Sequence, residues 1–127
     1  MFLNHVALVC SSEEKSDKFY KDVLDLEKLQ SKVVSSDLSK RIFDLDNEYQ
    51  VINYGNENIR FEIFISKKSD FAEKRLSHVC LNIKNMNLFL KRCAENQVDI
   101  SKIPKGENIL VFIKDYDDNL FEIKEKI

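Results

Sequence analysis

Two short phrases each occur twice in this chain, and their repetition constrains the fold more than any other feature. Leu3–Leu8 (LNHVAL) is echoed by Leu76–Leu81 (LSHVCL), and the triplet FEI occurs at Phe61–Ile63 and again at Phe121–Ile123. Each phrase is an apolar, strand-like run, and the histidine-containing and glutamate-containing phrases alternate along the chain. The sequence therefore predicts a duplicated module in which each copy begins and ends with a strand.

Each copy of the repeat supplies one imidazole and one carboxylate. The protein has only two histidines, and both stand at the same place in the repeated phrase. Alternate residues of a strand face the same side, so the four side chains can share the sheet face that turns away from the helices. Two nitrogen and two oxygen ligands suit a borderline divalent ion. The pattern predicts a two-fold related metal site from His5, Glu62, His78 and Glu122.

The first half of the chain predicts a strand, a helix and three more strands. Ser11 with Glu14 three residues later forms a capping-box pattern that opens the helix. The apolar face of this helix is expected at Phe19, Tyr20, Val23 and Leu24. The strands are expected at Leu3–Cys10, Glu27–Val34, within Arg41–Tyr54, and at Ile59–Ser66. The residues around Ser35–Glu48 are an insertion to which the sequence assigns no role.

The second half repeats this order in a shorter form. Asn85 is a suitable cap for a helix that runs to about Asn96, and Pro104 with Gly106 indicates a loop. Strands are expected at Leu76–Ile83, Val98–Ile100, Ile109–Lys114 and Asn119–Lys124. The prediction is an α+β fold of two tandem βαβββ modules that form a curved mixed sheet around a metal-site cavity. One domain, residues 1–127, would consist of module 1 (about 1–66), a connector (67–75) and module 2 (about 76–127).

Composition excludes several classes of function. The formal net charge of −2 and the interleaving of Lys with Asp and Glu argue against nucleic-acid binding, which needs clustered positive charge. No apolar stretch approaches the roughly 18 residues of a membrane-spanning helix, and no secretory signal is visible. Three cysteines without a CxxC pair are expected to be buried, reduced residues. We expect a cytoplasmic protein.

Two further stretches carry a resemblance to a known family. Phe19–Leu26 (FYKDVLDL) resembles an "FYxxvLGL" helix end, and Phe112–Ile123 resembles an "fxxDPDGNxxEl" ending. Together with the repeated His and Glu phrases, these motifs resemble the vicinal oxygen chelate superfamily, which includes glyoxalase I, bleomycin-resistance proteins, fosfomycin-resistance enzymes and extradiol dioxygenases. Asp25 and Asp118 stand where this family has glycine. Aspartate can adopt the positive-φ conformation at some cost.

The resemblance implies paired βαβββ modules around a metal site with His5, Glu62, His78 and Glu122 as ligands. The metal would be Zn, Ni, Co, Mn or Fe(II). It would bind vicinal oxygens of a small-molecule substrate and stabilise an enediolate after proton abstraction next to a carbonyl. Glu122 or Glu62 would act as the base. This set is similar to that of glyoxalase I, so a metal-dependent isomerase or lyase is expected, and a homodimer is common in the family.

Other functions stay open at this point. A bleomycin-resistance type of protein would bind and sequester a small molecule without needing the metal, and an epimerase of a CoA thioester commonly has Gln in place of Glu62. Fosfomycin-type enzymes use a single Glu, and extradiol dioxygenases need additional acid–base residues that a chain with two histidines lacks. Cys80 is expected to form part of the cavity wall. Arg60, on the same side of its strand as Glu62, could meet an anionic group, although a solvated arginine is the simpler interpretation.

Overall fold

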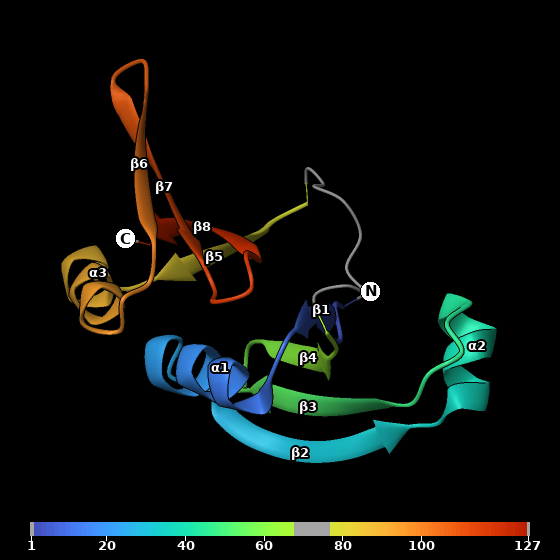
Figure 1. The fold of residues 1–127 in the computed structure, drawn as a ribbon. Coiled ribbons are helices and arrows are strands. Elements are labelled where there is room, and N and C mark those ends of the chain that lie inside the picture. Colours follow the sequence, from blue (N-terminus) through green and yellow to red (C-terminus); the bar gives the residue numbers. More distant parts are fainter. Residues whose placement is uncertain (1, 68–76, 127) are drawn as a thin grey trace. The chain divides into compact units, whose positions relative to one another are not determined.

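A computed structural model describes residues 2–67 and 77–126 of the chain (Figure 1). The chain divides into two compact units, Met1–Ala72 and Glu73–Ile127, here called unit 1 and unit 2. Each unit contains one four-stranded mixed sheet. Apart from Lys67, the predicted connector at residues 67–75 lies outside the described residues.

Unit 1 is built on a sheet with the strand order β1-β4-β3-β2. The first and last strands, β1 and β4, pair in parallel, and the other neighbours are antiparallel. Helix α1 and the π-helical segment η1 lie over one face of this sheet (Figure 1). The elements are β1 (Val6–Cys10), α1 (Glu13–Asp17), η1 (Lys18–Val23), β2 (Glu27–Val34), α2 (Ser36–Phe43), β3 (Tyr49–Gly55) and β4 (Arg60–Ile65).

Helix α1 begins one residue later than the capping box predicts. The N-cap is Ser12, whose side chain accepts a hydrogen bond from the backbone N–H of Lys15 at 3.2 Å, so the predicted cap at Ser11 is wrong. Starting at Glu13, the first turn places Ser16 on the buried side of the helix, fully covered and against the sheet. The start of the helix is therefore set by its contacts with the sheet. The choice of cap follows from that start, because Ser11 and Ser12 are equally suitable cap residues.

The chain continues without a break from α1 into η1, where the backbone N–H of Leu24 bonds to the carbonyl of Phe19 at 2.9 Å. This five-residue spacing is wider than the four-residue spacing of an α-helix. Phe19, Tyr20 and Val23 are consequently all fully buried under the sheet, as the apolar pattern predicts, while Leu24 is only partly covered. The ring of Tyr20 stacks on that of Tyr54 from β3, with centroids 5.4 Å apart.

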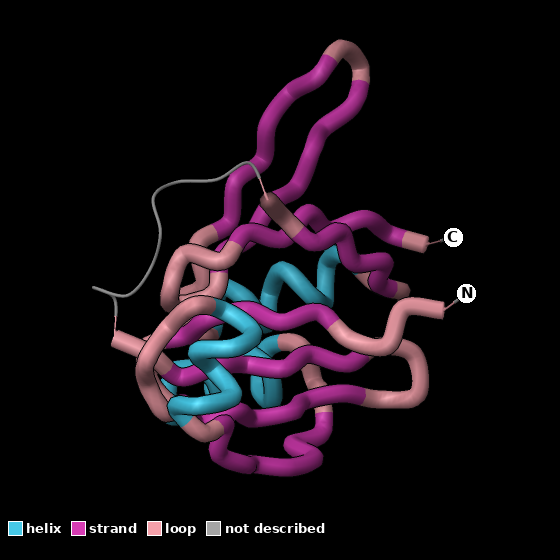
Figure 2. The backbone as a smooth tube through the Cα atoms, turned by 90° about the vertical axis from the view of Figure 1, so that its right-hand side faces the viewer, coloured by secondary structure: helices cyan, strands magenta, loops and turns pink. Residues whose placement is uncertain are grey.

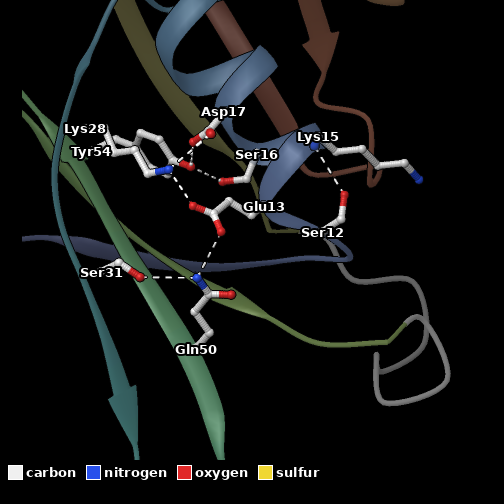
Figure 3. A network of polar contacts seen from close by, with 9 residues as sticks. All are labelled: Ser12, Glu13, Lys15, Ser16, Asp17, Lys28, Ser31, Gln50 and Tyr54. Carbon is white, nitrogen blue, oxygen red and sulfur yellow. Dashed lines mark hydrogen bonds and ion pairs between the residues drawn. The ribbon is translucent and has the colours of Figure 1, made fainter.

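A network of polar side chains fixes α1 to strands β2 and β3 (Figure 3). Lys28 of β2 binds the carboxylates of Glu13 at 2.5 Å and of Asp17 at 3.1 Å. The buried Tyr54 hydroxyl donates to Asp17 at 2.7 Å and lies 2.6 Å from the hydroxyl oxygen of Ser16. Hydrogen bonds from Lys28 and Gln50 lower the pKa of Glu13, and burial raises the pKa of Tyr54 far above its ordinary value. Each polar group under the helix thus has a partner, so burying the network costs little stability.

The segment Ser35–Glu48, to which the sequence assigns no role, contains an additional helix, α2. The Ser35 side chain caps it by accepting from the backbone N–H of Leu38 at 3.2 Å, and Asp44 ends it in the left-handed conformation with φ of 59°. Helix α2 lies beyond the ends of β2 and β3 (Figure 1). Its Phe43 ring contacts that of Phe64 edge-to-face, with centroids 5.4 Å apart. The first module is therefore a βαβββ unit with one helix inserted between its second and third strands.

Unit 2 repeats the plan without the insertion. Its sheet has the order β5-β8-β7-β6, with β5 and β8 parallel. Asn85 caps helix α3 by accepting from the backbone N–H of Leu88, which confirms the predicted cap. The β6–β7 hairpin extends as an arm beyond the part that pairs with β8 (Figure 2). The elements are β5 (Val79–Ile83), α3 (Met86–Glu95), β6 (Ile100–Lys105), β7 (Asn108–Lys114) and β8 (Leu120–Glu125).

Two sequence predictions about turns meet the structure differently. Pro104 lies within β6, opposite Ile109, so the prediction of a loop at this residue is wrong and only Gly106 lies in the turn. Strand β6 is at the edge of its sheet, where proline is tolerated because no neighbouring strand needs its missing N–H. Conversely, Asp25 and Asp118 have φ of 58° and 69°, as expected for residues that replace turn glycines.

The observed fold is α+β with two βαβββ modules, as predicted. Within residues 2–67 and 77–126, no helix is long and apolar enough to span a membrane.

The polar network makes a testable prediction about stability. Tyr54→Phe removes the hydroxyl that bonds to Asp17 and Ser16, so we expect the free energy of unfolding to fall by about 1–2 kcal/mol in urea denaturation. Tyr49→Phe is the matched control, because the Tyr49 hydroxyl is buried with no hydrogen-bond partner within the described residues. Its removal should change stability by less than about 0.5 kcal/mol or increase it. Equal losses in both variants would contradict the assignment.

Candidate metal centre

The register of the parallel strand pair places the two predicted ligands of unit 1 on one face of the sheet. In the β1–β4 pairing, Ala7 stands opposite Glu62, and His5 precedes β1 by one residue on the same side as Ala7. The opposite face carries Phe61 and Ile63, which are fully buried. The prediction that His5 and Glu62 face away from the helix is confirmed. These two residues are called the first ligand pair below.

The first ligand pair is in contact. The Nε2 atom of His5 lies 3.2 Å from a carboxylate oxygen of Glu62. Two ligands bound to one ion at about 2.0–2.2 Å stand about 3.0–3.4 Å apart in tetrahedral or octahedral geometry. The observed separation therefore equals the spacing that two ligands of a shared divalent ion would have.

Asn4 fixes the orientation of the His5 ring. Its side-chain oxygen lies 2.7 Å from Nδ1 of His5, so this ring nitrogen carries a hydrogen and donates it. Nε2 of the neutral ring is then an acceptor facing a second acceptor on Glu62. Two acceptors at this distance repel each other unless a proton or a metal cation lies between them. A hydrogen bond from the other ring nitrogen is the usual arrangement of a metal-binding histidine, and the sequence pattern gave no sign of this role for Asn4.

Unit 2 repeats the arrangement with different neighbours. Cys80 stands opposite Glu122 in the β5–β8 pairing, as Ala7 stands opposite Glu62 in unit 1. Val79, at the start of β5, directly follows His78, and the His78 ring meets the ring of Phe112 edge-on, with centroids 6.0 Å apart. Because Phe112 also stands opposite Glu122, His78 and Glu122 share a face of the second sheet. They are called the second ligand pair.

The Glu122 carboxylate has two polar neighbours, and Glu122 is one of the residues that line a groove. The thiol of Cys80 donates to its Oε2 atom at 3.6 Å, and the Lys124 amine lies 3.9 Å from the same oxygen. The groove has a volume of about 310 Å³ and is lined by Glu122, Ile123, Lys124 and the strand residues Asn108–Val111. This volume is at the lower end of the range for small-molecule sites.

The prediction of three buried cysteines is right for two of them. Cys10 and Cys93 are 1% and 0% exposed, whereas Cys80 is exposed on the face that carries the second ligand pair. Its strand partner is the polar Glu122, so the thiol serves as a hydrogen-bond donor on that face. Partial desolvation and the Glu122 carboxylate raise the pKa of the Cys80 thiol, which favours the protonated, donating form.

The structure thus brings His5 and Glu62 into contact in unit 1 and places His78 and Glu122 on one face of the sheet in unit 2. Among the residues that the structure describes, no three His, Cys, Asp or Glu side chains form a group that could hold a metal ion. Each ligand pair by itself supplies one nitrogen and one carboxylate, which is half of the ligand set predicted from the sequence.

Each of the two βαβββ modules presents one histidine and one glutamate on the sheet face away from its helix. This combination of fold and side chains defines a class of paired-module proteins. The family model of the Glyoxalase/Bleomycin resistance protein/Dioxygenase superfamily matches residues 2–123. The chain therefore belongs to this superfamily, also called the vicinal oxygen chelate superfamily, as its motifs predict. No curated protein sequence is significantly similar to it.

Solved structures share the fold at low sequence identity. The fosfomycin resistance protein FosX of Listeria monocytogenes is 15% identical over 100% of this chain and 94% of that chain, with a TM-score of 0.72. A glyoxalase family protein of Enterococcus faecalis is 17% identical over 96% and 95% of the two chains, with a TM-score of 0.72. A mutant of the Listeria protein, 16% identical over 97% and 88% with a TM-score of 0.71, is complexed with Mn(II) and 1S,2S-dihydroxypropylphosphonic acid.

The exposure of Cys80 can be tested with a thiol-specific reagent. In the native, metal-free protein we expect one thiol to react, because Cys10 and Cys93 are buried and burial raises the pKa of Cys93 to about 11. Unfolding in denaturant should raise the number to three. Cys80→Ala serves as the control and should leave no reactive thiol in the native protein. Equal reactivity of all three cysteines before unfolding would contradict this arrangement.

Proposed function

We propose that this protein is a divalent-metal enzyme that removes a proton next to a carbonyl group of a small molecule, the glyoxalase I type of reaction. The observation that carries the proposal is the 3.2 Å contact between Nε2 of His5 and Glu62, with the other ring nitrogen held by Asn4. The two side chains have the separation of two ligands of one ion, and the ring nitrogen that faces away from Glu62 donates a hydrogen bond to Asn4.

In this proposal the first and second ligand pairs together hold one ion. His5, Glu62, His78 and Glu122 supply two imidazoles and two carboxylates, a set that suits Zn, Ni, Co, Mn or Fe(II). When bound, the metal would act as a Lewis acid toward two neighbouring oxygens of the substrate and make the adjacent C–H bond more acidic. The Mn(II) complex of a FosX variant, which shares the fold, agrees with a divalent ion in this superfamily.

The protein side chains carry the proton. Glu122 is our candidate for the base that takes it from the carbon, because Glu122 lines a groove with a volume of about 310 Å³. The Cys80 thiol donates a hydrogen bond to Oε2 of Glu122 at 3.6 Å. Glu62 is the equivalent carboxylate of the first pair and would return the proton to the neighbouring carbon, so that the hydrogen moves from one carbon of the substrate to the next.

The four-ligand set favours this chemistry over that of the FosX proteins. Fosfomycin-type sites use a single glutamate, whereas here Glu62 contacts His5 as closely as a ligand would. A bleomycin-resistance type of binding protein has no need for two such pairs. We expect the protein to be cytoplasmic, as the sequence predicts. A homodimer is the assembly that we expect.

Metal binding is the first test. We expect protein that is purified without chelator, or reloaded with Zn, Mn, Ni, Co or Fe(II), to contain divalent metal in stoichiometric amount by elemental analysis. His5→Ala and His78→Ala should each reduce metal affinity by at least about tenfold, because each removes one nitrogen ligand. Glu107→Gln, in the turn of the β6–β7 hairpin, is the control and should bind metal normally. If the wild-type protein binds no transition metal under any loading condition, the proposal is wrong.

Catalysis is the second test. The metal-loaded protein should isomerise a hemithioacetal, and Glu122→Gln should lower kcat by about 10²- to 10⁴-fold, the usual contribution of a placed general base. Glu95→Gln is the control, because it makes the same chemical change at an exposed residue of α3 that does not line the groove. Unchanged function in Glu122→Gln, together with metal-independent binding of a flat aromatic ligand, would favour the sequestering type instead. Metal-dependent turnover of fosfomycin without isomerase activity would favour the FosX type.

A further inference from the structure

A row of side chains crosses the sheet of unit 1 on the face that carries the first ligand pair. Gln30 of β2 stands opposite Asn53 of β3, Asn53 stands opposite Glu62 of β4, and Glu62 stands opposite Ala7 of β1. Directly opposed side chains of neighbouring strands lie about 5 Å apart at Cβ. Asn53 is therefore an immediate neighbour of a proposed metal ligand, and the reaction described above gives it no task.

Asn53 is a polar residue in a place where polarity is costly. Its side chain is 0% exposed. Its oxygen accepts a hydrogen bond from Nε of Arg60 at 3.1 Å, but its amide nitrogen Nδ2 has no partner among the described residues. A buried donor without a partner lowers stability, so such a group commonly has a function. The side chain lies on the same face as Glu62, so this donor is directed toward the ligand side of the sheet.

Arg60 stands two residues before Glu62 on β4 and faces the same side. The contact with Asn53 uses only Nε, so the rigid, planar guanidinium is oriented while its terminal amino groups remain for another acceptor. Within residues 2–67 and 77–126, Arg60 forms no ion pair with a carboxylate. An oriented arginine without an internal anion, next to an unpaired amide donor, has the chemistry of a site for an oxyanion.

We propose that Arg60, positioned by Asn53, binds an anionic group of the substrate, either a carboxylate or a phosphonate, beside the first ligand pair. This inference rests on the proposed function, because it names the chemical class of that reaction's substrate. Two residues along a strand span about 7 Å. The substrate is accordingly a small molecule whose negative charge lies a few carbon atoms from the oxygens that meet the metal. Arg60 contacts the substrate, and Asn53 is a positioning residue.

The simpler alternative is that Arg60 only satisfies the buried oxygen of Asn53. The two roles differ in one measurable property, because only an anion site changes when anions are added. The Nε–H resonance of Arg60 in nitrogen-15 NMR spectra reports on the guanidinium directly, and its assignment follows from its disappearance in Arg60→Lys. Weak binding of small probes is measurable in this way in the metal-free, full-length protein.

The experiment titrates metal-free protein with sodium methylphosphonate and sodium acetate at constant ionic strength. We expect a saturable shift of the Arg60 Nε–H resonance, while acetamide, the neutral counterpart of acetate, has no effect. Arg60→Met, followed through the backbone N–H groups of Asn53 and Glu62, should weaken binding about tenfold or more. Arg60→Lys keeps the positive charge but lacks the planar guanidinium, so its anion affinity should lie between those of the wild type and Arg60→Met. The preference between the two probes identifies which anion the substrate carries.

Arg41→Met is the matched control, because Arg41 is an exposed arginine of α2 that pairs with Asp37 at 3.6 Å. It should leave anion binding unchanged. The proposal is overturned if the wild-type protein binds neither probe, or if Arg60→Met binds them as tightly as wild type does. Because the readout needs neither metal nor turnover, its failure is distinct from a failure of the proposed function. Loss of metal binding alone would leave the Arg60 result standing.

Discussion

The parallel pairing of the first and last strands of each module is the constraint on which the rest of the site depends. Val6 stands opposite Phe61 in unit 1, and Val79 stands opposite Phe121 in unit 2. This common register turns both phenylalanines of the FEI triplets toward the helices and both glutamates toward the other face. A slip of one residue would exchange the two sets and bury the carboxylates under the helices. The hydrophobic cores and the ligand pairs are therefore specified by the same interaction.

Much of this arrangement could be predicted from the sequence, because alternation along a strand leaves little choice once one face is apolar. What escaped prediction depends on features without such a pattern. Helix α2 was missed because it spans only eight residues and has no counterpart in the second copy of the repeat. The π-helical turn at η1 also has no sequence signal. The contact of Cys80 with Glu122 could have been found by aligning the two repeats, whereas that of Asn4 with His5 depends on local side-chain geometry.

The strand positions on either side of the glutamate correspond in the two sheets, but different residues occupy them. In unit 1 the row contains Asn53 beside Glu62 and Ala7 on the other side of Glu62. In unit 2 Phe112 and Cys80 occupy the corresponding positions around Glu122. The first carboxylate thus has a hydrogen-bonding neighbour that orients Arg60, and the second has an apolar ring that packs against His78. Both modules retain the ligand pair, while the positions next to it have diverged.

This divergence has a consequence for the proposed reaction. In the proposed reaction, a charged group of the substrate gains a partner at Arg60, whereas the position of unit 2 that corresponds to Asn53 holds the ring of Phe112. An exact duplication would give both glutamates the same neighbours. The unequal neighbours remove this equivalence, so we expect the charged end of the substrate beside Glu62 and not beside Glu122.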